Sequence, residues 1–191
     1  MNAMTGAMMI NEGLPVSRDR LGAYLTGKTA PGDAPRTLPR LSDFWFRKNA
    51  ERRGPQRSDF QPEELLNVLP DVFILDCLPD GTFRYRLVGT RLAGSFPRDP
   101  TTRLTGSFAG HWADRTIGDF AVRIAESASP HLMLTNGPEQ LSPGPVGAAV
   151  AAPLFDDDGN VNMVLGAVIF GSASMMAQYP PVRMAIYPIL P

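Results

Sequence analysis

With 191 residues, 43% of them hydrophobic, and a net formal charge of −1, the chain has the size and composition of one globular domain with extensions. The near-neutral charge excludes a global field that would attract nucleic acid, and no apolar run approaches the ~20 residues of a membrane-spanning helix. A single cysteine excludes an internal disulfide framework and fits a reducing compartment, so we expect a cytoplasmic protein with no membrane partner.

Residues 1–37 mix small residues with glycine and proline, and only residues 17–25 have weak helical character. A segment without periodic apolar residues has little surface to bury, so we expect a flexible or loosely docked arm. The character of the sequence changes at Leu38, where we place the start of a domain that extends to residue 171.

A helix is predicted over residues 41–53, where apolar residues recur at helical spacing before a Gly-Pro stop. It presents Leu41, Phe44 and Trp45 on one side. Leaving two aromatic rings in water is unfavourable by roughly 1.5–3 kcal/mol each, so we expect them to be covered. The outer face of the chain's own sheet or a second subunit could cover them. We favour a homodimer with these three residues at its interface.

The other positions around this helix are basic: Arg40, Arg47, Lys48, Arg52, Arg53 and Arg57. One interpretation is a contact with nucleic acid or an anionic partner, in which Trp45 stacks on a base. The interpretation that we favour is an amphipathic helix with solvated arginines, because the charge is local and no DNA-reading motif accompanies it.

Two strands are predicted over residues 72–77 and 83–88, joined by a turn at residues 79–81. Apolar and charged residues alternate along the second strand, which is the period of a half-buried strand. Gly81 accepts the positive φ that tight turns require. Cys77 stands in an apolar strand, and we interpret it as a small buried hydrophobe rather than a nucleophile.

The main helix is predicted within residues 104–128, with Asp114 as its cap and one apolar stripe that includes Ile117, Phe120, Ala121, Ile124 and Ala128. Three further strands are predicted over residues 131–135, 146–155 and 161–170. The last of these is almost continuously apolar, so we expect a central strand that is buried on both faces.

The remaining residues, 172–191, include Pro180, Pro181, Pro188 and Pro191, so we expect a tail that adds no further regular layer. Because the sequence ends soon after the last predicted strand, we expect no output domain on this chain.

The order of the predicted elements is a helix, two strands, short helices, a long helix and three strands. Tight turns between consecutive strands favour an antiparallel sheet, and helices grouped between the second and third strands favour an α+β fold over a Rossmann topology. We predict a five-stranded antiparallel sheet with helices on one face, the last strand near its centre, and an N-terminal flanking helix.

Three phrases of the sequence stand in fixed order: GPQRSDF at residues 54–60, LPDVFILD at 69–76 and FRYRLVGT at 83–90. With the order of elements, they give residues 40–170 a resemblance to the PAS domain family, above all to its small stand-alone bacterial members. The consensus of those proteins carries "PxRxDFDP", "LPxLFLLDV" and "FRYRLVGT". The resemblance implies the PAS fold, a sensory or protein-interaction role and dimerisation through a flanking helix. One departure is the pair of prolines within residues 96–100, so the pocket shape is not carried over.

The sequence offers no set of residues for catalysis or for a metal site. Its two histidines and one cysteine lack the spacing of a zinc site, and residues 89–94 lack the Lys-Ser/Thr pair of a phosphate loop. The acidic residues 156–160 lack the Glu that closes an EF-hand. We therefore predict a protein that is not an enzyme, and the sequence identifies no cofactor.

A pocket between the sheet and the helices is the remaining candidate site. Its predicted lining combines apolar side chains with polar groups that would orient a ligand: Phe83, Tyr85, Arg86, Phe96, Trp112, Phe120 and Ile124. The alternative is that these side chains fill the core completely. If the pocket held haem, His111 would be its ligand.

We predict a non-catalytic sensory or protein-interaction module in intracellular signalling, which acts through a protein partner or through its oligomeric state. The alternative is a sensor that binds a small molecule or haem, and a basic nucleic-acid adaptor is the third possibility. A Soret band would select haem, and salt-sensitive DNA binding would select the adaptor.

Overall fold

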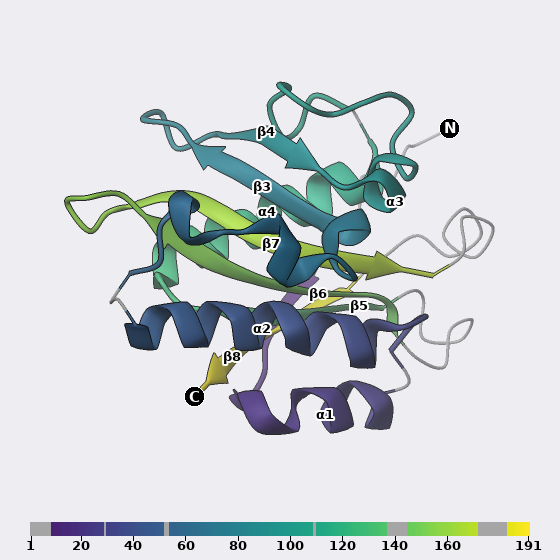
Figure 1. The fold of residues 1–191 in the computed structure, drawn as a ribbon. Helices are drawn as coiled ribbons and strands as arrows, with labels where there is room; N and C mark the ends of the chain where they lie inside the picture. The colour runs from purple at the N-terminus through teal and green to yellow at the C-terminus, as the bar shows by residue number, and fades with distance from the viewer. Residues whose placement is uncertain (1–8, 29, 52–53, 109, 137–144, 172–182) are drawn as a thin grey trace, which may run out of the picture.

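The structure, a computed structural model, describes residues 9–28, 30–51, 54–108, 110–136, 145–171 and 183–191. In this part of the chain one twisted β-sheet carries helices on both of its faces (Figure 1). The architecture is the predicted α+β arrangement, but it differs from the prediction of helices on one face only, because the predicted flanking helix buries its apolar side on the opposite face of the sheet. No described helix is both long enough and apolar enough to cross a lipid bilayer.

The described residues form eight strands: β1 Met9–Glu12, β2 Val16–Ser17, β3 Val72–Cys77, β4 Phe83–Val88, β5 His131–Asn136, β6 Pro145–Phe155, β7 Val161–Phe170 and β8 Arg183–Leu190. Their order across the sheet is β1-β8-β5-β6-β7-β3-β4, and β2 also pairs with β8. The five predicted strands, β3 to β7, are antiparallel to their neighbours. β7 lies between β6 and β3, which is the central position predicted for it.

The sheet continues beyond β5 with strands from both ends of the chain, and this differs from the prediction. β8 pairs with β5 in antiparallel orientation, and β1 and β2 pair with β8 in parallel orientation. Residues 183–190 are thus not a tail without regular structure, because Met184, Ile186 and Ile189 are buried. Pro188 is tolerated because it falls between the stretches of β8 that pair with β1 and with β2.

The arm predicted for residues 1–37 is likewise ordered from residue 9 onward. Besides β1 and β2 it contains helix α1, Leu21–Gly27, which buries Leu21 and Leu25 against the rest of the chain. Residues 1–8, and Pro180 and Pro181 at the other end, lie outside the described residues.

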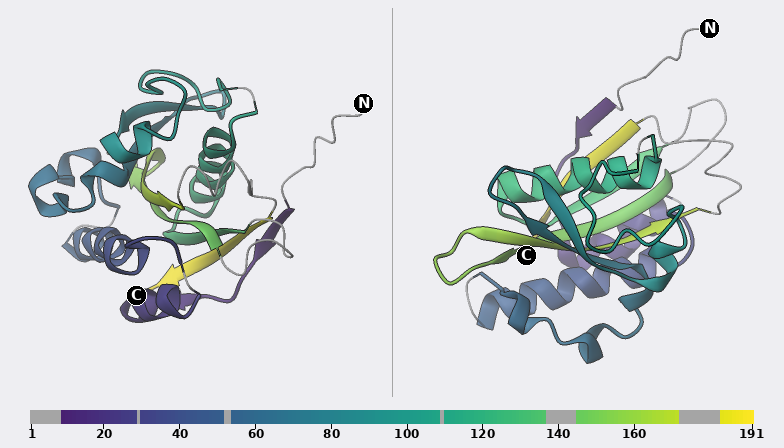
Figure 2. Two further views of the ribbon diagram at one scale, coloured as in Figure 1. Left: turned by 90° about the vertical axis from the view of Figure 1, so that its right-hand side faces the viewer. Right: turned by 90° about the horizontal axis from the view of Figure 1, so that it is seen from above.

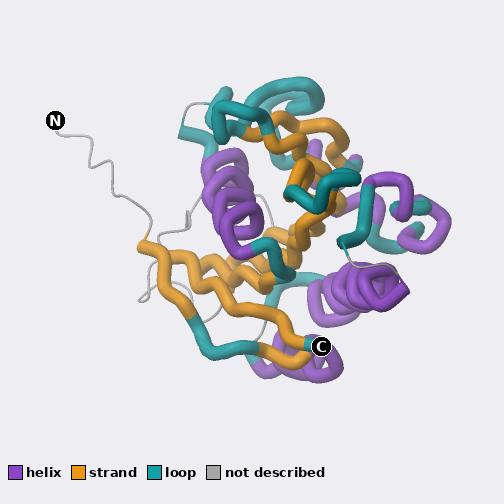
Figure 3. Tube along the Cα trace, turned by 90° about the vertical axis from the view of Figure 1, so that its left-hand side faces the viewer, coloured by secondary structure: helices purple, strands orange, loops and turns teal. Residues whose placement is uncertain are grey.

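Helices and single turns of 3-10 helix complete the fold: α2 Ala34–Glu51, α3 Thr90–Ala93, α4 Trp112–Ser127, η1 Arg18–Arg20, η2 Arg57–Asp59, η3 Pro62–Leu65 and η4 Leu69–Asp71. α4 lies on one face of the sheet, and α2 with α1 lies on the opposite face (Figures 2 and 3). Alternate residues of β3 separate the two cores: Val72 and Ile74 pack toward α2, and Phe73 and Leu75 pack toward α4.

The predicted flanking helix is α2, and it begins at Ala34 rather than at residue 41. The helix includes Pro39. Its first free amides are satisfied by the Asp33 carbonyl, which accepts hydrogen bonds from Arg36 and Thr37. The predicted end of the helix at residues 52–53 lies outside the described residues.

α2 covers its own sheet, which corrects the predicted dimer contact. Leu41, Phe44 and Trp45 are only 0%, 3% and 5% exposed, because they pack on the outer face of the sheet. The Trp45 indole N–H also donates a hydrogen bond to the Pro153 carbonyl at 2.7 Å. These three side chains are not available to a second copy, so a homodimer stays a prediction without them.

Candidate ligand pocket

An open cavity of about 490 Å³ lies between β4, the loop at residues 104–111 and the first turns of α4. This volume falls within the range of about 300–1,000 Å³ that is typical of small-molecule sites. The cavity is lined by Gly81, Thr82, Phe83, Thr105, Gly106, Phe108, Gly110, His111, Asp114, Arg115, Gly118, Asp119 and Val122. A smaller cavity of about 350 Å³ shares Phe83 and Val122 with it and extends to Cys77.

The loop that frames the cavity runs back along β4 before α4 begins. Thr102 and Thr105 donate backbone hydrogen bonds to the carbonyls of Tyr85 and Phe83, at 2.7 and 2.8 Å. Gly106 and Gly110 then take positive φ values of 83° and 73°, which a right-handed helix does not contain. The helix starts at Trp112, two residues before the predicted cap Asp114, and the loop that precedes it frames the cavity.

Asp114 is buried at the wall of the cavity and joins three elements. Its Oδ1 accepts a hydrogen bond from the Tyr85 hydroxyl on β4 at 2.8 Å, and its Oδ2 accepts one from the Phe108 amide at 2.9 Å. The residue at the N-cap position of the helix is His111, whose side chain makes no capping hydrogen bond. Asp114 thus fixes the loop and β4 relative to α4, rather than only capping the helix.

Burial and the neighbouring Asp114 carboxylate both raise the pKa of Tyr85 above its ordinary value, and burial is the larger cause. The phenol therefore keeps its proton and serves as a hydrogen-bond donor to Asp114. Its ring is fully buried, so Tyr85 supports the cavity from behind and does not face it.

An aromatic cluster lies beside the cavity, and two of its members, Phe108 and His111, line it. The His111 ring stacks on Phe96 and Trp112, with ring centroids 5.1 and 5.8 Å apart. Phe96 also meets the edges of Tyr85 and Phe108, at 5.6 and 5.4 Å. His111 Nδ1 is buried and has no hydrogen-bond partner among the described residues. Any contact from this ring to a group in the cavity would therefore have to use Nε2.

Six of the seven predicted pocket residues fall into three groups in the structure. Phe83 lines the cavity, and Phe96 with Trp112 belongs to the aromatic cluster beside it. Phe120 and Ile124 are 0% exposed and, like Tyr85, fill the core between α4 and the sheet.

Arg86 does not belong to the pocket, which corrects the prediction. Successive residues of a strand point to opposite faces, so Tyr85 and Arg86 cannot both face α4. Arg86 lies 3.4 Å from the Asp76 carboxylate, which also binds Arg84 at 2.9 Å.

The sequence prediction missed the polar residues of the cavity, Asp119 and Arg115 among them. The signal that could have found them is the cluster of Gly106, Gly110 and Gly118 around the start of the helix, because glycines leave the space that a cavity needs.

Cys77 borders the smaller cavity as a protonated thiol. Burial raises its pKa to about 11, and the Asp76 carboxylate adds to the shift. At neutral pH the thiol is thus not a nucleophile, in line with the interpretation from sequence. The described residues also contain no group of three or more His, Cys, Asp or Glu side chains suited to a metal ion.

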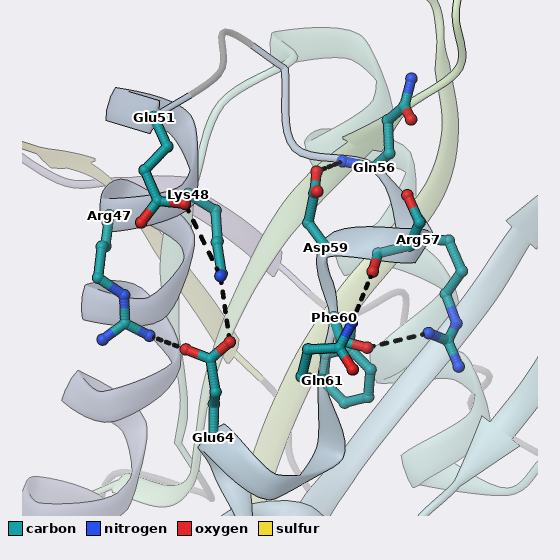
Figure 4. Close-up of polar contacts among 10 residues, drawn as sticks. Arg47, Lys48, Glu51, Gln56, Arg57, Asp59, Phe60, Gln61 and Glu64 are labelled. Atoms are coloured by element: carbon teal, nitrogen blue, oxygen red, sulfur yellow. Dashed lines mark hydrogen bonds and ion pairs between the residues drawn. The ribbon is translucent and has the colours of Figure 1, made fainter.

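The signature phrase at residues 54–60 lies outside the cavity and anchors the exit of α2 (Figure 4). The Gln56 amide donates to the Asp59 carboxylate at 2.8 Å, and the Gln56 side chain donates to Asp157 on the β6–β7 turn at 2.7 Å. Arg57 donates to the Phe60 carbonyl at 3.3 Å and lies over its ring. The phrase therefore supports the fold in this structure.

Two basic residues of α2, Arg47 and Lys48, form ion pairs with acidic residues. Glu64 pairs with Arg47 and with Lys48, the latter at 3.1 Å, and Lys48 also lies 3.8 Å from Glu51 (Figure 4). Trp45 is buried, so it cannot stack on a base as the nucleic-acid interpretation requires. Arg52 and Arg53 lie outside the described residues.

A family model described as "PAS domain" matches residues 34–169. The chain belongs to the PAS domain family. The match begins with α2 and ends within β7, so β1, β2, α1 and β8 are additions to the PAS core. PAS domains are in general non-catalytic sensory modules, and they commonly bind small ligands or mediate protein interactions.

No curated protein matches the chain in sequence. A solved structure described as "VqmA bound to DPO" shows 11% identity and a TM-score of 0.40, with 61% of this chain and 59% of that chain covered. The similarity is too low to transfer anything about that protein's ligand to this PAS domain.

Proposed function

We propose that this PAS domain is a sensory module that binds a small molecule in the cavity between β4, the 104–111 loop and α4, and that it signals through a protein partner. The observation that carries the proposal is the cavity itself, with an apolar ring and a buried carboxylate in one wall. Such a combination of apolar lining and few polar groups is typical of small-molecule sites.

The position of the cavity suits a sensor. A ligand there would touch β4 through Phe83, the loop through Phe108 and the helix through Asp114. Asp114 already holds these three elements together by its hydrogen bonds. A ligand can shift this domain between two arrangements of these elements only if it binds one arrangement more tightly than the other. A ligand that touches all three elements at once meets this condition, because moving one element relative to another changes its contacts.

Native mass spectrometry of the full chain purified from cells tests the proposal. We expect a small-molecule adduct that is lost on denaturation. In Val122→Trp, a large ring replaces a 43% exposed side chain at the cavity, and we expect the adduct to be reduced or absent. Leu66→Trp, at a 65% exposed position away from the cavity, is the matched control and should keep it.

An adduct that persists unchanged in Val122→Trp would contradict the site. The absence of any adduct, together with no thermal stabilisation by a metabolite library, would contradict ligand sensing. A Soret absorption band would identify the adduct as haem, with His111 as the residue to substitute first.

A further inference from the structure

The cavity wall contains a carboxylate that has no cationic partner among the described residues. Asp114 is 1% exposed, and each of its oxygens accepts one hydrogen bond, from the Tyr85 hydroxyl and from the Phe108 amide. Both donors are neutral, and a carboxylate offers about four lone-pair positions, so acceptor capacity is left over. A buried charge without an opposite charge is unfavourable, so this position favours a partner that brings positive charge and N–H donors.

The other charged groups of the lining leave an excess of negative charge. Asp119 is half-buried there; burial raises its pKa, and the nearby Arg115 guanidinium opposes the shift. Arg115 is exposed, and it is the one arginine or lysine among the lining residues, against two carboxylates. Arg98 adds a second guanidinium beside Phe108, so the charges around the cavity nearly balance, and the preference for a cation depends on Asp114, which is buried without a cationic partner.

The apolar part of the lining combines Val122 with two aromatic rings, and the face of an aromatic ring attracts cations. Phe83 and Phe108 are 5% and 8% exposed at the cavity. The Arg98 guanidinium lies 5.7 Å from the centre of the Phe108 ring, so this ring already has a cationic neighbour. An ammonium group near the Phe83 ring would gain the same kind of interaction.

The size and the ligand set of the cavity favour an organic cation over a metal ion. A volume of about 490 Å³ is far larger than a single ion requires, and the described residues contain no group of three metal-binding side chains. A Cβ atom at Gly106 or Gly110 would meet nothing within 4 Å, so the mouth of the cavity is open beside both residues.

We infer that the cavity binds a small organic cation, a protonated amine on an apolar body. Its N–H groups donate hydrogen bonds to the Asp114 carboxylate, and its body packs on Phe83 and Phe108. The inference rests on the proposed ligand-sensing function and names the chemical class of the ligand.

Titration calorimetry of the full chain with matched compounds tests the inference. The probes are phenethylamine, phenylethanol and phenylpropanoate, and butylamine, butanol and butanoate, which are cationic, neutral and anionic members of two series. We expect each amine to bind more tightly than its alcohol and its carboxylate. In Asp114→Asn we expect the amines to bind about tenfold or more weakly, because a charged hydrogen-bond acceptor is lost.

Two further variants keep the test decisive if Asp114→Asn does not fold. Asp119→Asn removes the second carboxylate from a half-buried position and should weaken the amines by a smaller factor. Asp43→Asn removes a 63% exposed carboxylate on α2, on the other face of the sheet, and should leave amine binding unchanged.

An alcohol or carboxylate that binds as tightly as its amine would overturn the inference. Amine binding unchanged in both Asp114→Asn and Asp119→Asn would also overturn it. A native adduct without a basic nitrogen would overturn the inference and leave ligand sensing intact, whereas no adduct and no binding by either series would contradict both proposals.

Discussion

Replacing Trp45 tests whether α2 covers its own sheet. Its indole is 5% exposed and donates a 2.7 Å hydrogen bond to the Pro153 carbonyl, 108 residues away in sequence. Truncation of a buried aromatic residue to alanine typically costs about 3–5 kcal/mol. Trp45→Phe keeps most of the ring but leaves the Pro153 carbonyl unpaired, which costs about 1–3 kcal/mol. Since domains of this size are stable by only about 5–15 kcal/mol, both losses are measurable.

Urea unfolding of the native chain, Trp45→Phe and Trp45→Ala measures these differences, and sedimentation at several concentrations measures the oligomeric state. We expect the free energy of unfolding to fall in the order given, with the sedimentation behaviour unchanged. Leu66→Ala, at a 65% exposed position, is the control and should change stability by less than about 0.5 kcal/mol. The reasoning is refuted if Trp45→Ala dissociates a dimer while the subunit keeps its stability, because the ring would then belong to an interface.

Three other predictions concern single sites. Burial raises the pKa of Asp71 from 3.8 to about 6, so between these pH values the native state binds more protons than the unfolded state. The free energy of unfolding should therefore fall as pH rises from about 4 to about 6. Asp71→Asn should flatten this dependence in urea unfolding experiments. A Cβ atom at Gly89 would lie 2.1 Å from the Leu69 carbonyl oxygen, so Gly89→Ala should lower the thermal midpoint, whereas Gly118→Ala, with its nearest contact at 3.4 Å, should not. Cys77 should react with iodoacetamide much more slowly at pH 7 than a free cysteine peptide, and equal rates would contradict its raised pKa.

The five central strands could be predicted because their signal is local. β7 is apolar almost throughout and β4 alternates, and the structure places both strands at the predicted residues. β8 is largely apolar but was interpreted as a tail because of the prolines in residues 172–191, and it is ordered by pairing with β5 and β1. β1 has only four residues and is ordered by pairing with β8, from the other end of the chain. These pairings form because β5 has an unpaired edge once β6 covers its other side. The local sequence of β1 or of β8 does not show that this edge is available.

The cavity was predictable only in part, for a related reason. The alternation in β4 correctly turns Phe83 and Tyr85 toward α4, but it also excludes Arg86, which the prediction included. Asp114 looks like a helix cap in the sequence. Its observed role depends on two partners, the Tyr85 hydroxyl on β4 and the Phe108 amide in the loop, where two glycines take positive φ values.

α4 connects the cavity with the strands that were added to the PAS core. Asp114, in its first turn, lines the cavity, and Arg123, in its second half, forms an ion pair with Glu12 on β1. A ligand that shifted this helix would therefore change the ion pair with β1. β1 is a four-residue edge strand, and its backbone amides pair only with β8 among the described residues, so they should respond to such a change.

Hydrogen exchange of residues 9–12 with and without the bound small molecule measures this coupling. We expect a change in the native chain and a smaller one in Glu12→Gln. Identical exchange with and without the ligand would show that β1 is insulated from the cavity.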